Sequence, residues 1–178
     1  MLPSLSSIRL RMLFIMLSTA FAAATVASAQ TGLYAEYGAS QVDAPGGDWI
    51  HGPTFGLYHD FYSIPLIHFG ADLRGSLLGI SQNTQLYSGE IGPRVSIHPH
   101  VLPLMPYAEG VFGIGHYDFG EGRGSDNQFE YQFLGGVDLT FFPHLDWRVI
   151  EFSYGGLSTL NGDLHPKTLS TGLVLRLP

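Results

Sequence analysis

The segment Gln128–Phe142 (QFEYQFLGGVDLTFF) constrains the fold more than any other part of the sequence. Every second residue from Phe129 to Phe141 is apolar or small, whereas the residues between them are mostly polar or small. Strict alternation of this kind predicts a β-strand with one apolar face and one polar face. The alternation continues beyond the roughly five or six residues of a usual strand in a soluble domain. A tilted strand that crosses a bilayer needs roughly 9–11 residues, so we interpret the segment as one strand of a membrane β-barrel.

The composition of the 178 residues agrees with this interpretation. Charged residues make up 13% of the chain and aromatic residues another 13%, whereas an ordinary soluble domain has roughly 25% charged residues. No stretch after residue 30 is apolar for long enough to form a transmembrane helix. The absence of cysteine excludes disulfides and thiol chemistry. The net charge of −7, with no basic patch, argues against nucleic acid as a partner.

Residues 1–29 have the pattern of a secretory signal peptide. Arg9 and Arg11 supply the positive charge, Met12–Val26 is apolar, and Ala27–Ala29 fits the small-x-small cleavage rule. The alternative is an uncleaved membrane anchor, but the apolar run is short for a spanning helix. We therefore predict cleavage between Ala29 and Gln30, which divides the chain into a leader (1–29) and a barrel domain (30–178).

Alternating segments after the leader predict an all-β fold, an eight-stranded antiparallel up-and-down transmembrane β-barrel. The predicted strands are Gly32–Ser40, Ile50–Phe61, Leu66–Ile80, Gln85–His98, Met105–Tyr117, Gln128–Phe142, Trp147–Gly156 and Thr168–Leu177. The connections after the second, fourth and sixth strands are tight and contain proline, whereas the other connections are rich in Gly, Asp, Asn and Ser. In outer-membrane barrels the short turns lie in the periplasm. An even number of strands then places both termini in the periplasm.

One face of the predicted strands is bulky and nearly uncharged, and the other is polar and rich in glycine. Soluble proteins avoid a continuous apolar belt, so we predict that the apolar face contacts lipid. A one-residue register slip would turn Arg74 or Arg94 towards lipid. An arginine at the bilayer midplane destabilises the barrel by about 2–4 kcal/mol. We expect aromatic girdles at the two rims, formed by Trp147, Phe141, Phe142 and Phe61 at one and by Trp49, Tyr87, Tyr117 and Tyr131 at the other.

The polar faces place a set of charged residues in the lumen. These are Glu36, Asp60, Asp72, Glu90, Glu109, Glu130, Asp138 and Glu151, with the arginines Arg74, Arg94 and Arg176. A buried charge needs a partner. We therefore expect Arg94 to bridge Glu109 and Glu151 in the periplasmic half of the barrel.

We likewise expect Arg74 to pair with Asp72 or Glu90 near mid-height. Eight acids against three arginines then leave five acids that must meet water or hold a proton. These charges fit either a polar plug or a path for protons or cations. We favour the plug, because the interior of an eight-stranded barrel is just wide enough for side chains to fill.

Motifs for catalysis or metal binding are absent from the sequence. His98-Pro99-His100 is the densest histidine cluster, but it has no third ligand nearby, so we interpret it as a surface turn and expect no metal. The sequence has no metalloprotease, nucleophile-elbow or P-loop motif. His59 and His116 lie on the outward face with nothing that sets a catalytic geometry, so we expect neither an enzyme nor a cofactor.

Three stretches, together with the leader and the alternating segments, carry a resemblance to a known family. They are PYAEGVFGIG (Pro106–Gly115), WRVIEFSYG (Trp147–Gly155) and the final LSTGLVLRLP. Over roughly residues 30–178 the chain resembles the small eight-stranded outer-membrane β-barrels, a family that includes the outer-membrane-protein-A barrel, the opacity proteins and porin-like proteins. Barrels of this family usually end in Phe or Trp, whereas this chain ends in Pro178.

The resemblance implies a monomer in the bacterial outer membrane that contacts lipid and the barrel-insertion machinery. The leading functional hypothesis is a non-enzymatic structural barrel with a plugged lumen. The main alternative is a narrow pore or small-molecule binder of the porin type. Further alternatives are an adhesion module acting through residues 41–49 and 119–127, and a lipid-modifying enzyme.

Overall fold

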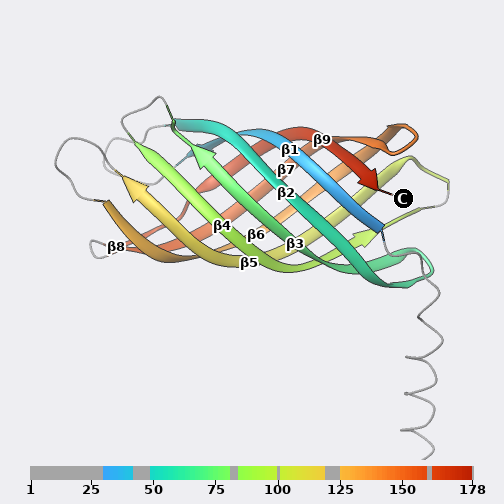
Figure 1. Ribbon diagram of the computed structural model, residues 1–178, viewed down its shortest axis with the longest axis horizontal. Helices are drawn as coiled ribbons and strands as arrows, with labels where there is room; N and C mark the ends of the chain where they lie inside the picture. Colours follow the sequence, from blue (N-terminus) through green and yellow to red (C-terminus); the bar gives the residue numbers. More distant parts are fainter. Residues whose placement is uncertain are drawn as a thin grey trace, which may run out of the picture.

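The computed structural model describes residues 30–41, 49–80, 84–99, 101–118, 125–159 and 162–177. Its strands are β1 (Gln30–Gln41), β2 (Trp49–Ile64), β3 (Ile67–Leu78), β4 (Gln85–Ile97), β5 (Leu104–Asp118), β6 (Ser125–Phe142), β7 (Leu145–Thr159), β8 (Gly162–Leu164) and β9 (Lys167–Leu177) (Figure 1). Among these residues there is no helix that is long and apolar enough to cross a membrane. The predicted leader and Ala29 lie outside the described residues.

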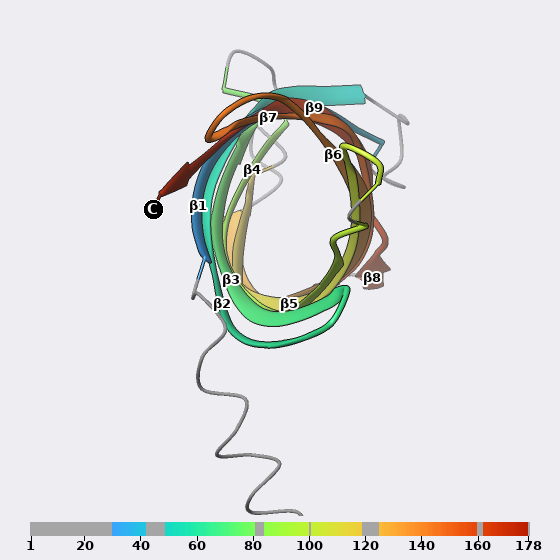
Figure 2. The same ribbon diagram turned by 90° about the vertical axis from the view of Figure 1, so that its right-hand side faces the viewer.

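Eight strands close into a barrel in which every neighbouring pair is antiparallel (Figure 2). Pairing follows chain order from β1 to β7, and β9 closes the barrel by pairing with both β1 and β7. The predicted eight-stranded antiparallel barrel is therefore confirmed. The short strand β8 pairs with β7 and lies within residues 158–167, which the sequence analysis treats as a polar loop. That part of the prediction is wrong.

The two ends of the barrel differ in their connections. The turn end carries the β2–β3, β4–β5 and β6–β7 connections, and the pairing of Thr31 with Leu177 places both ends of the described barrel there as well. Leu66 and His144 adopt positive φ angles of 78° and 66° in the tight β2–β3 and β6–β7 turns. The loop end carries the other connections, of which residues 42–48, 81–83 and 119–124 lie outside the described residues. Assignment of the turn end to the periplasm stays a prediction.

Polar and apolar side chains are distributed in the barrel in the reverse of a soluble protein. The exposed apolar side chains of the outer wall include Leu33, Phe55, Leu73, Ile91, Phe112, Phe133, Phe152 and Leu173. The buried side chains of the inner wall include Glu36, Asp72, Arg74, Glu90, Arg94, Glu109, Glu130, Asp138 and Glu151. An apolar outer band around a polar interior is the arrangement of a transmembrane barrel. These residues face the sides that the alternation predicted.

One of the predicted girdle residues faces the wrong way. Trp49, Trp147 and Phe61 are exposed on the outer wall as expected, but Tyr117 is 3% exposed. The reason is the strand period of two, which places Tyr117 of β5 on the same inward face as Tyr107.

Candidate functional site

A bulge in β7 changes which residues of that strand face the lumen. The register of β7 with both neighbouring strands shifts beside Val149, so Arg148 and Glu151 both point inward although they lie three positions apart. Uninterrupted alternation would put these two residues on opposite faces. Arg148 was therefore not predicted to face the lumen, and the prediction of three lumen arginines is wrong. The signal that could have revealed the bulge is an arginine on a face otherwise given to lipid, where it costs about 2–4 kcal/mol at the midplane.

Arg148 is completely buried and binds carboxylates from three strands. Its Nε atom donates to Asp138 Oδ1 of β6 at 2.9 Å, and its Nη1 atom donates to Glu36 of β1 and, at 3.2 Å, to Glu151 Oε2 of β7. Ser170 of β9 donates a further hydrogen bond to Glu36 at 2.6 Å. These bonds join β1, β6 and β7 to one side chain in the lumen.

Arg74 reaches across the lumen to β7. Its Nη2 atom donates to the two carboxylate oxygens of Glu151 at 2.9 and 3.2 Å, and its Nε atom donates to Tyr34 Oη at 3.2 Å. Asp72, one of its two predicted partners, lies 3.7 Å from Nε. Glu90, the other, is not among the ion pairs of Arg74 in the described part of the chain, although β3–β4 register places it directly opposite.

Arg94 has one of its two predicted partners. It donates to Glu109, its neighbour on β5, as the sequence analysis expected. Its second ion pair is with Asp138 Oδ2 at 3.6 Å and not with Glu151, which the other two buried arginines bind instead. The expected bridge to Glu151 is therefore wrong.

Three buried tyrosines are stacked with the three buried guanidinium groups. The distances from guanidinium carbon to ring centroid are 4.2 Å for Arg94–Tyr58, 4.0 Å for Arg94–Tyr107, 4.5 Å for Arg148–Tyr107, 4.4 Å for Arg148–Tyr34 and 5.6 Å for Arg74–Tyr34. We name these six residues the arginine cluster. Cation–π contacts of this kind are worth about 2 kcal/mol or more when they are shielded from water.

Each tyrosine of the arginine cluster lies over a glycine on a neighbouring strand. The pairs, read from the strand register, are Tyr34 with Gly56, Tyr58 with Gly32 and Tyr107 with Gly136. A Cβ atom at Gly136 would lie 2.4 Å from Tyr107 Oη, so only glycine leaves room for the ring in this position. Tyr107 Oη in turn donates to Glu151 Oε2 at 2.6 Å.

Nearer the loop end, two buried glutamates face each other, and neither has an arginine partner among the residues that the structure describes. Glu90 of β4 and Glu130 of β6 are both opposite Gly113 of β5, and the amide of Gln132 donates to them at 3.1 and 2.9 Å. Within the described segments, one oxygen of each carboxylate has no hydrogen-bond partner. We name these two residues the glutamate pair.

The sequence analysis expected five of the eight lumen acids to lack an arginine. In the described part of the chain that group is smaller and consists of Asp60, Glu90 and Glu130. The number is smaller because a single buried arginine contacts several carboxylates. Arg74 contacts Glu36, Asp72 and Glu151, and Arg94 contacts Glu109 and Asp138. Arg176 pairs with a different acid near the turn end, where its Nε atom lies 2.9 Å from Asp146 Oδ2.

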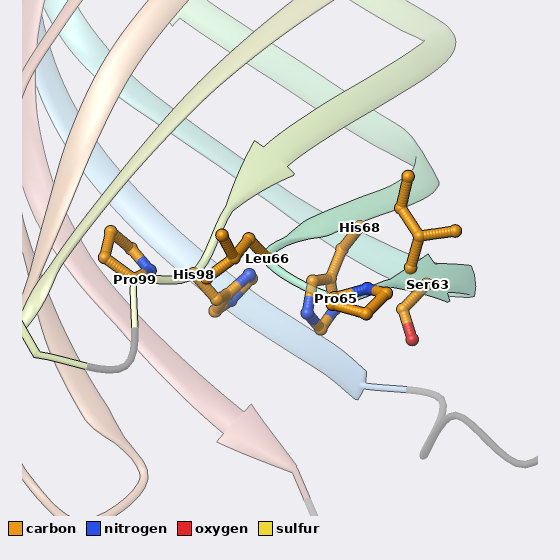
Figure 3. Close-up of a pocket in the computed structure, with 7 residues that line it drawn as sticks. Ser63, Pro65, Leu66, His68, His98 and Pro99 are labelled. Carbon is orange, nitrogen blue, oxygen red and sulfur yellow. The ribbon is translucent and has the colours of Figure 1, made fainter.

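A second group of polar side chains, the turn-end cluster, consists of Asp60, His68 and His98. One ligand atom from each lies within 4.8 Å of those of the other two. Beside them is a pocket of about 470 Å³ (Figure 3), whose lining is Ser63, Ile64, Pro65, Leu66, His68, His98 and Pro99. Burial, with smaller contributions from His68 and Arg94, lowers the pKa of His98 to about 4. His98 is therefore neutral at physiological pH.

The outward histidines considered for catalysis have other partners. His59 Nδ1 lies 2.8 Å from Thr31 Oγ1, and His116 Nδ1 lies 2.8 Å from Asn127 Oδ1. Both contacts are on exposed strand residues. A hydroxyl and an amide of this kind fix the rings on the barrel wall, and the contacts give no reason to assign either histidine to a catalytic site.

No protein-family model matches the sequence, and no curated protein is similar to it in sequence. Solved structures are similar in fold. The crystal structure of neisserial surface protein A is 16% identical with a TM-score of 0.56, over 82% of this chain and 96% of that one. Ail, the attachment invasion locus protein of Yersinia pestis, is 15% identical with a TM-score of 0.55, over 85% of this chain and 100% of that one. The chain thus has the fold of the small eight-stranded outer-membrane β-barrels, as predicted.

Proposed function

We propose that the protein is a structural barrel of the bacterial outer membrane whose lumen is plugged by its own side chains, and that it neither conducts solutes nor catalyses a reaction. The observation that carries the proposal is Arg148, a completely buried guanidinium in the lumen of the barrel with carboxylate partners on three strands. Water that passed along the lumen would expose such a side chain.

The arginine cluster supports the plug by connecting strands that are not neighbours in the barrel wall. Arg74 of β3 binds Glu151 of β7, and Arg94 of β4 contacts Asp138 of β6. The side chains that make these contacts are at most 4% exposed. Contacts that cross the lumen fill the space a solute would need, and they tie the two sides of the barrel together.

The outer surface supports contact with lipid as the main interaction of the barrel wall. Its exposed large apolar side chains are mainly leucine, isoleucine and phenylalanine over the length of the strands. We expect insertion by the barrel-insertion machinery, a monomeric state, and an orientation with the turn end, and therefore both termini, in the periplasm. Cleavage of the leader after Ala29 belongs to the same proposal.

Single-channel recording in planar lipid bilayers tests the plug. We expect no stable openings from protein purified from outer membranes in detergent, because buried ion pairs obstruct the lumen. A large porin added to the same bilayer is the positive control, and a band that shifts on boiling before SDS gel electrophoresis shows that the barrel is folded. Stable openings from the folded protein would refute the plug and favour the narrow-pore alternative.

A further inference from the structure

The turn-end cluster is assembled from three consecutive strands. Asp60 lies on β2 beside a bulge at Phe61, where the register with β3 shifts. His68 lies on β3, opposite Ser96 of β4. His98 follows two residues after Ser96, so it is on the same side of the wall as His68, and its backbone N–H donates to Leu66 O at 2.8 Å.

These three side chains converge on one point. His68 Nδ1 lies 3.9 Å from Asp60 Oδ2, and the rings of His68 and His98 have centroids 4.0 Å apart. Figure 3 shows both rings at the pocket in the turn end, next to the β2–β3 turn. Bulges are frequent beside functional sites because they redirect a side chain, and the bulge at Phe61 directly follows Asp60.

The carboxylate of Asp60 is an independent indication of a missing ligand. Its side chain is 2% exposed, and neither of its oxygens has a hydrogen-bond partner among the described residues. Within the same residues, the Nδ1 atoms of His68 and His98 are also buried without a hydrogen bond. Buried polar groups are nearly always paired, so three unpaired groups that face one another need a common partner. Arg94 makes no ion pair with Asp60 in the described part of the chain, where its partners are Glu109 and Asp138.

We propose that Asp60, His68 and His98 form a binding site for one divalent transition-metal ion of the zinc type, at the turn end of the barrel. Two imidazole nitrogens and one carboxylate oxygen are a common ligand set for zinc, with bonds of about 2.0–2.2 Å. Small side-chain rotations bring ligand atoms that are within 4.8 Å of one another to such distances. The neighbouring pocket leaves room for a water molecule as the fourth ligand.

The chemistry of the ligands favours a zinc-type ion over calcium or magnesium. Calcium and magnesium prefer sites made of oxygen ligands, whereas imidazole suits zinc, copper and nickel. The site differs from the His98-Pro99-His100 turn considered in the sequence analysis, because its other two ligands come from β2 and β3. His100 lies outside the described residues.

Isothermal titration calorimetry with Zn²⁺ tests the proposal. The protein is purified from outer membranes in detergent without a histidine tag, stripped with a chelator, and titrated. We expect one ion per chain, and a loss of affinity of about tenfold or more in Asp60→Asn and in His68→Gln, since even changes to residues that only orient a metal ligand cost about 10–100-fold. His59→Gln is the matched control, because His59 is adjacent to Asp60 but points outward, and it should bind like the unaltered protein.

Two results would overturn the site. One is the absence of Zn²⁺ binding by the unaltered, folded protein. The other is binding that His100→Gln abolishes while Asp60→Asn and His68→Gln leave it unchanged, which would show chelation by the surface turn alone. Boiling-dependent migration on SDS gels shows that each variant is folded, and His68→Gln provides the test should Asp60→Asn fail to fold. Zn²⁺ binding and conductance are measured separately. A failure of the metal site therefore does not refute the plugged lumen, and openings of the barrel do not refute the metal site.

Discussion

The arginine cluster and the glutamate pair occupy the same lumen and are equally buried, yet their buried charged groups have different kinds of partner. In the arginine cluster, every guanidinium has a carboxylate partner and an aromatic ring against it. In the glutamate pair, Glu90 and Glu130 share the amide of Gln132 and have no arginine partner in the part of the chain that the structure describes.

The difference shows that register alone does not decide which charges pair. Arg74 is directly opposite Glu90 in the β3–β4 register, but its guanidinium extends across the lumen to Glu151. A long side chain inside a closed barrel has partners on the far wall as well as on the neighbouring strand. Glu151 has more hydrogen-bond donors around it than Glu90 has, because it accepts bonds from Arg74, Arg148 and Tyr107 at once. A carboxylate with several charge-assisted bonds is held strongly.

Removing Arg148 should have the largest effect on the stability of the barrel. In Arg148→Met, three buried carboxylates lose their shared cation, and we expect the free energy of unfolding to fall by about 3–5 kcal/mol. Urea titration in lipid vesicles, followed by tryptophan fluorescence, measures it. Arg176→Met is the matched control and should lose less, since Arg176 is partly exposed near the turn end. Equal losses in the two variants would show that the cluster has no special part in stability.

Removing one hydroxyl group should have an intermediate effect. In Tyr107→Phe, the ring stays between two guanidinium groups but the 2.6 Å bond to Glu151 is lost. We expect the free energy of unfolding to fall by about 1.5–3 kcal/mol, the usual contribution of a hydrogen bond to a charged group. The same urea titration applies. Tyr131→Phe on the outer wall should change the free energy of unfolding by less than about 0.5 kcal/mol, and a comparable loss there would contradict the assignment.

Neutralising a member of the glutamate pair should have the smallest effect on the free energy of unfolding. In Glu130→Gln, a buried carboxylate becomes an amide of similar size and no ion pair breaks. We expect the free energy of unfolding to stay within about 1 kcal/mol of the unaltered protein, or to rise. Glu151→Gln is the matched variant at a carboxylate that binds the arginine cluster, and it should lose several times more stability. Equal losses would mean that Glu130 has a cationic partner after all.

The order of residue types within short segments predicted the features that depend on neighbouring residues or on one pair of adjacent strands. The alternation of Phe129–Phe141 predicted β6 and its faces, and the proline-bearing connections predicted the tight turns at one end. The pairing of Arg94 with Glu109 was accessible as well, because these residues are directly opposite on neighbouring strands. Each of these features needs information from only a few residues or from one pair of adjacent strands.

Arg148 and the turn-end cluster show where local pattern failed. A single extra residue, Val149, reverses the faces of β7 on one side of it, and no turn residue or composition change marks the position. His98 was visible as part of a histidine pair, but Asp60 and His68, which lie 38 and 30 positions earlier in the chain, were not recognisable as its neighbours. Strand register brings them together, and register is set by the barrel as a whole.

The order of residue types along the chain was enough to predict an antiparallel barrel with apolar residues outside and charges inside. The physical reason is that a strand has a period of two, so the pattern of side chains reveals both faces before any contact is known. The tertiary structure decided which charges meet, because closure of the barrel brings opposite walls within reach of an arginine side chain. It also decided where the alternation breaks, since a bulge is stabilised by the lumen partners that it allows Arg148 to bind.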